Sequence, residues 1–272
     1  MDSKLFKRNV SQVYLSLVPF LVFAFALGVG YISYKIYLPV WIINVCLMLT
    51  ASWSLGLHVI RNHDVEKKHL AIAAFFLIVP WILVSMFFGL GPPPETPAGW
   101  VATATEQEIR YSMLIIAGVF IAVGFAALRE KLKNTAGSFY SMLGFSAIMI
   151  AIPLFIVNMI FYSAYLPELF RFMVVSGLEK RPEWNNPVRE EFNLLALVEV
   201  SITYLAGAAI SAALRDAGWL SKIASRICII ISLFGFLTVA FLGHYSPFII
   251  PAFPFIIPYY IAINLLRRAS NS

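Results

Sequence analysis

The residue with the clearest chemical potential is Glu199, which lies in the apolar stretch FNLLALVEVSITYLAG. It is the only acidic residue inside the long apolar blocks of the chain. A carboxylate inside a membrane is costly unless it is protonated, paired or hydrated, so such residues often mark proton or cation sites. Glu199 is therefore our candidate proton or cation site. The alternative is a protonated carboxyl that bonds to a neighbouring backbone and serves only structure.

Three more polar side chains are expected near the same level. Counting residues inward from Phe192 places Glu199 about 10 Å below the outer surface. The same count places Asn158 and Asn44 in the outer half of the membrane, and His244 at the outer rim. These four residues predict an outward-facing polar pocket for a small solute.

Four prolines interrupt the apolar segment 244–260, at Pro247, Pro251, Pro254 and Pro258. In one continuous helix they would share an arc of about 60°. Pro247 suits a helix start, whereas each of the others removes a backbone hydrogen bond. Freed carbonyls inside a membrane need protein or water partners. We therefore expect this face to line the pocket or to act as a hinge, or else simply to kink a packing helix.

The elements that hold these residues are predicted to be membrane helices. The 272-residue chain is 60% hydrophobic and only 12% charged, whereas soluble domains are about 25% charged. Its charge-free blocks reach the roughly 20 residues that one crossing requires. We predict an all-α, polytopic membrane protein with about eight transmembrane helices in a single transmembrane domain. The predicted spans are 13–34, 38–60, 70–90, 110–128, 139–162, 192–214, 223–242 and 247–266.

The basic residues predict the orientation. Of the 20 Lys and Arg residues, fourteen fall on the side of both termini and six on the other. Cytoplasmic segments are enriched in Lys and Arg, so both termini are predicted to be cytoplasmic, in a plasma or inner membrane. The net charge of +6 is then a topology signal and not a sign of nucleic-acid binding.

The longer connection 163–192 includes a short amphipathic pattern. Its apolar residues are Leu166, Leu169, Phe170, Phe172, Met173 and Val174, and its charged residues are Glu168 and Arg171. This pattern predicts a short helix at the membrane surface.

The sequence lacks the residues that several kinds of functional site require. Cys46 and Cys228 form no CxxC pair, which leaves a disulfide or zinc site unsupported. The chain has no P-loop, GxSxG or HExxH motif and no Lys or Asp in mid-span. We predict no cofactor, no metal and no catalytic group, which disfavours an enzyme.

Three functions fit these residues. A small transporter or channel-like protein would give water access to Glu199. A membrane anchor or accessory subunit of a larger complex would have partner subunits besides the lipid bilayer, and a dry, apolar setting for Glu199. A membrane-embedded enzyme on a lipid-like substrate would use Glu199 as its general acid or base.

Overall fold

The computed structural model describes the chain except for residues 1–2, 30–31, 62, 90–93, 247–249 and 272. Every regular element in the described part is helical. The α-helices are α1 (Ser3–Val29), α2 (Tyr34–Leu55), α3 (Val65–Gly89), α4 (Pro97–Ala102), α5 (Ala104–Leu132), α6 (Ser138–Ile160), α7 (Leu166–Val175), α8 (Asn185–Asp216), α9 (Lys222–Leu242) and α10 (Ile256–Asn271). A π-helical segment, Phe161–Tyr165, joins α6 to α7.

Six helical segments in the described residues are long and apolar enough to cross a membrane. They are Lys35–Leu55, Val65–Met86, Ala104–Leu132, Ser138–Val175, Asn185–Asp216 and Lys222–Leu242. This supports the predicted helical membrane protein. The count of eight spans and the cytoplasmic side of the termini stay predictions.

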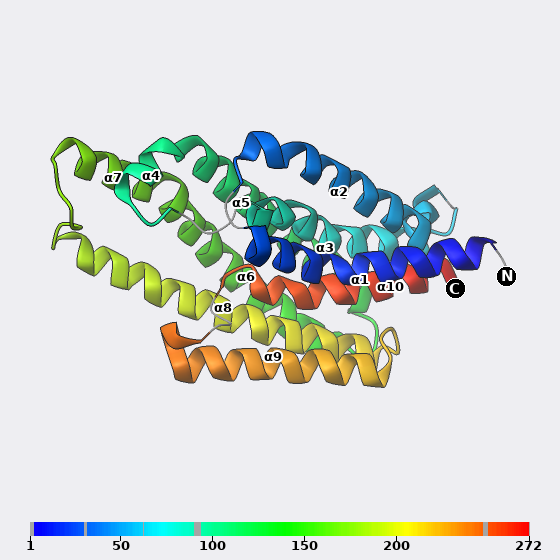
Figure 1. Cartoon of the computed structure of the whole chain (residues 1–272). Helices are drawn as coiled ribbons and strands as arrows, with labels where there is room; N and C mark the ends of the chain where they lie inside the picture. Colours follow the sequence, from blue (N-terminus) through cyan, green and yellow to red (C-terminus); the bar gives the residue numbers. More distant parts are fainter. Residues whose placement is uncertain (1–2, 30–31, 62, 90–93, 247–249, 272) are drawn as a thin grey trace.

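The long helices run alongside one another in a bundle (Figure 1). Both termini, the α2–α3 connection and the α8–α9 turn lie at one end, which we call the terminal end. The short helices α4 and α7 pack on each other at the opposite end, which we call the capped end. The most extensive helix pairs are α6 with α8, α3 with α5, and α8 with α9.

Glycines bring α6 and α8 into close contact. A Cβ atom at Gly137 would lie 2.1 Å from the carbonyl oxygen of Ala213, and one at Gly144 would lie 3.3 Å from that of Ala206. The two contacts also fix the antiparallel register of these helices. Residues that face each other have numbers that sum to about 350.

The amphipathic pattern in 163–192 forms α7. Leu166, Leu169, Phe170 and Met173 are buried, and Glu168 and Arg171 form an exposed ion pair at 2.7 Å. Phe172 and Val174 are exposed, which differs from their predicted place on the apolar face. Because the π-helical segment continues α6 directly into α7, this helix extends a membrane helix and packs on α4.

The prediction of one helix from residue 247 onward is wrong for residues 250–255. Pro251 lies in a turn, Pro254 is the middle residue of the 3₁₀ turn Phe253–Phe255, and α10 begins only at Ile256. Pro258 is thus in the first turn of α10, where a backbone N–H has no intrahelical acceptor. These prolines therefore free no carbonyl within the helix. Pro247 lies outside the described residues.

Helix α10 supplies the polar contact that a proline in α1 makes necessary. Pro19, inside α1, has no N–H for the carbonyl of Leu15 four residues earlier. The buried Tyr259 hydroxyl donates to that carbonyl at 2.7 Å. The next residue, Tyr260, donates to the carbonyl of Ser16, also at 2.7 Å. The first and last helices are tied together where α1 lacks its own hydrogen bond.

We expect Tyr259→Phe to destabilise the protein by about 1–3 kcal/mol, because it leaves the buried Leu15 carbonyl without a donor. Tyr260→Phe is the matched control. The carbonyl of Ser16 keeps its helical donor, the amide of Phe20, so this change is expected to cost less. Unfolding of both variants in detergent micelles measures the difference. Equal losses would contradict the role assigned to Pro19.

Candidate functional site

Glu199 is fully buried in α8, and neither of its carboxylate oxygens has a hydrogen-bond partner within the described residues. Thr203 Oγ1, one helical turn farther along α8, donates at 2.8 Å to the backbone carbonyl of Glu199. A buried polar group without a partner is costly and rare in folded proteins, which makes Glu199 the most unusual residue of this helix.

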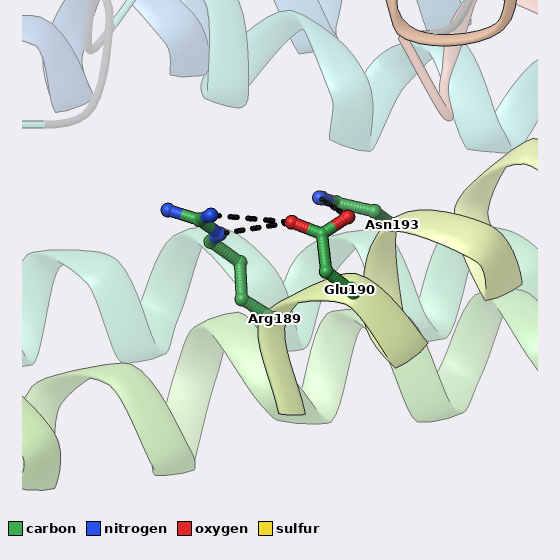
Figure 2. A network of polar contacts seen from close by, with 3 residues as sticks. All are labelled: Arg189, Glu190 and Asn193. Atoms are coloured by element: carbon green, nitrogen blue, oxygen red, sulfur yellow. Dashed lines mark hydrogen bonds and ion pairs between the residues drawn. The ribbon is translucent and has the colours of Figure 1, made fainter. Parts of the chain in front are cut away.

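A second glutamate on the same helix shows how a carboxylate is normally satisfied. Figure 2 shows Glu190, near the exposed start of α8, with Arg189 and Asn193 around it. Arg189 donates to Glu190 Oε1 at 3.2 and 3.4 Å, and the Asn193 amide donates to Oε2 at 3.4 Å. Nine residues later, Glu199 has none of these partners in the described part of the chain.

The setting of Glu199 is apolar. The next residue, Val200, packs with Tyr204 and with Val239 of α9. The α6–α8 register places Glu199 level with about Ala151, which is buried. One turn farther toward the capped end, Phe155 of α6 meets Phe255 of the 3₁₀ turn edge to face, with ring centroids 5.1 Å apart.

Asn158 of α6 is the second predicted site residue that lies in the interface between α6 and α8. It is 1% exposed, and neither side-chain polar atom has a partner among the described residues. The register places it about seven residues, or about 10 Å, farther than Glu199 toward the capped end. The two residues therefore belong to the same helix pair at successive levels and not to one ligand shell.

Asn44 is not part of this interface. Its amide oxygen accepts from the Tyr14 hydroxyl of α1 at 2.8 Å, and its amide nitrogen donates to Ser85 Oγ of α3 at 3.2 Å. These bonds tie α1, α2 and α3 together. Its position in the structure is that of a satisfied packing residue.

His244 belongs to the 3₁₀ turn Gly243–Tyr245, and its side chain lies outside the described part of the structure. A Cβ atom at Gly243 would lie 3.6 Å from Leu197 Cδ1. The backbone of this turn is therefore close in level to Glu199.

A cavity of about 170 Å³ lies between Glu199 and the capped end. It is lined by Tyr111, Leu114, Met159, Tyr162, Ile250, Pro251 and Ala252. The rings of Tyr111 and Tyr162 stack in it with centroids 5.1 Å apart. Glu199 does not line this cavity. On the α6 register, the Phe155–Phe255 pair lies between the level of the cavity and that of Glu199.

Polar residues at the start of the predicted spans, or just before them, are buried at the capped end. Gln107 and Arg110 of α5 and Asn185 of α8 are each 0% exposed, and Asn185 Oδ1 accepts from the Tyr165 hydroxyl at 2.8 Å. Arg110, at the start of the predicted span 110–128, is one of the six basic residues predicted on the side opposite the termini. The signal that identifies the α5 residues is helical spacing, because Gln107 and Arg110 continue the buried face of Leu114 and Gly118.

No family model matches the chain, and comparison with curated proteins and with solved structures finds no match either.

Proposed function

We propose that this protein is a small membrane carrier in which Glu199 binds a proton or cation that moves with a solute. The supporting observation is the full burial of Glu199 without a partner for its carboxylate among the described residues. Such residues in membrane helices recur in proton and ion pathways. The proposal includes eight spans, cytoplasmic termini and a plasma or inner membrane, as the charge distribution predicts.

In this proposal the structure is an occluded conformation of the carrier, in which Glu199 is closed off from water. The predicted open pocket around Glu199 is replaced by a small cavity toward the capped end, on the predicted outer side. The Phe155–Phe255 pair then separates this cavity from the level of Glu199. Residues 250–255 line the cavity through Pro251 and also provide Phe255, so their movement would open a route to Glu199. Asn158 is the polar residue on that route.

A membrane anchor or accessory subunit is the second candidate. The same full burial of Glu199, next in the chain to the apolar cluster around Val200, is what that function predicts. The two proposals differ in whether water ever reaches the carboxyl.

Deuterium exchange of the Glu199 carboxyl, followed by infrared spectroscopy in lipid nanodiscs, distinguishes them. The band lost in Glu199→Gln identifies the group. A carrier that visits an open state is expected to exchange within minutes, and Phe255→Leu is expected to speed the exchange at least about tenfold by weakening the aromatic pair. Phe76→Leu, which changes an aromatic pair between α3 and α5, is the control. No exchange over hours, together with a co-purifying partner, would favour the subunit.

A further inference from the structure

A cavity of about 700 Å³ lies at the terminal end of the bundle. We call it the terminal cleft. Four parts of the chain meet around it: the start of α3, the α5–α6 turn, the α8–α9 turn and the end of α10. Its charged and aromatic lining residues are Asp64, Glu66, Lys67, His69, Glu130, Lys131, Lys133, Trp219 and Arg268.

Several of these charges already have partners. Lys67 pairs with Asp64 at 3.6 Å, and Lys133 pairs with Glu130. Asp64 also accepts from the backbone amide of Lys67 at 3.1 Å. This amide, followed by the Lys67 charge, holds the pKa of Asp64 below its usual value. Asp64 is thus ionised and satisfied.

Two opposite charges in the cleft have no such partner. No ion pair or hydrogen bond of the Lys131 or Glu66 side chain occurs within the described part of the chain. The Arg268 guanidinium donates to the carbonyl of Gly218 and lies 5.9 Å from the ring centroid of Trp219. The cleft therefore presents both a cationic and an anionic group to a ligand, beside an aromatic ring.

The cleft lies where candidate membrane spans end. The span in α3 begins at Val65, the span in α5 ends at Leu132, and the span in α8 ends at Asp216. Its lining includes the buried Leu70. If these helices span a membrane, the cleft lies at the depth of the lipid headgroups, and basic pockets between membrane helices bind such groups.

We propose that the terminal cleft binds the headgroup of a phospholipid that has both a phosphate and a primary ammonium. Lys131 and Arg268 would meet the phosphate, and Glu66 would accept hydrogen bonds from the ammonium. A trimethylammonium group has no N–H to donate to a carboxylate, so it fits less well. A purely anionic headgroup leaves Glu66 facing negative charge.

The test is lipid retention by the purified full-length protein, measured by native mass spectrometry after mixing with vesicles of defined composition. Phosphatidylethanolamine is expected to be retained in preference to phosphatidylcholine and phosphatidylglycerol. Lys131→Gln and Glu66→Gln are each expected to lower its retention by about fivefold, the size of one partly exposed ion pair. Lys222→Gln, a change at the same end that does not line the cleft, is the control.

The same headgroup could belong to a membrane lipid or to a soluble ligand. Water-soluble glycerophosphoethanolamine distinguishes these two possibilities. If it binds without an acyl chain and both variants weaken it, the headgroup assignment holds and the ligand is soluble. Equal retention of all three lipids, or retention unchanged in both variants, would overturn the proposal. Neither result depends on whether Glu199 takes part in transport.

Discussion

Replacing Glu199 by leucine is expected to make the protein more stable and, under the proposed carrier function, to abolish coupled transport. The carboxyl loses its hydration in the bundle and gains no hydrogen bond from the described residues. An apolar side chain of similar size removes that cost. Even a buried ion pair, whose charges satisfy each other, can often be replaced by apolar residues with no loss or with a gain of about 1–4 kcal/mol. Residues that serve function often lower the stability of the protein that carries them.

Thermal unfolding of the purified variant in detergent measures the stability. Glu199→Gln is the matched control, since it keeps the shape of the side chain and still buries a polar group. We expect the leucine variant to be more stable than both the glutamine variant and the wild type. A leucine variant less stable than the wild type by about 1 kcal/mol or more would mean that the carboxyl is hydrogen-bonded and structural.

The second large effect is expected at Gly137, where α6 begins against α8. A Cβ atom there would lie 2.1 Å from the carbonyl oxygen of Ala213 and 3.0 Å from its Cα. The neighbour is backbone, which cannot rotate away, so Gly137→Ala must push the two helices apart. We expect a loss of about 3 kcal/mol or more, at the upper end of overpacking effects.

Gly144→Ala is the control for this prediction, because it lies on the same helix and faces the same partner. Its Cβ atom would meet atoms of α8 at 3.2 to 3.5 Å, a contact that small shifts relieve. Alanine also favours the helix over glycine by about 1 kcal/mol, so the net change should be small. Similar unfolding free energies for the two variants would show that the close approach at Gly137 relaxes easily.

Hydropathy identifies most of the long helices but not their ends. Helix α8 was predicted from 192 and begins at Asn185, and α5 was predicted from 110 and begins at Ala104. Hydropathy detects only the apolar middle of a helix, which is the part that lies in lipid. The backbone hydrogen bonds of the helix continue into the polar sequence on either side. The buried Gln107 lies in such an extension, which is why hydropathy alone missed it.

The candidate site was only partly predictable. The burial of Glu199 and Asn158 follows from their place in apolar segments, and the structure places both in the α6–α8 interface. The place of Asn44 does not follow from depth, because depth says nothing about which neighbouring helix a side chain faces. Its partners on α1 and α3 depend on how the helices pack.

The bonds between α1 and α10 affect how the chain is made. Helix α10 leaves the ribosome after α1–α9, yet Tyr259 and Tyr260 bond to carbonyls of α1. Contacts so distant in sequence form late and slowly. Until α10 packs, the surfaces of α1 and α3 that it covers therefore remain without their partner helix. During this interval a nascent chain is open to misassembly or degradation, and it is protected only once the sixteen-residue helix α10 has packed.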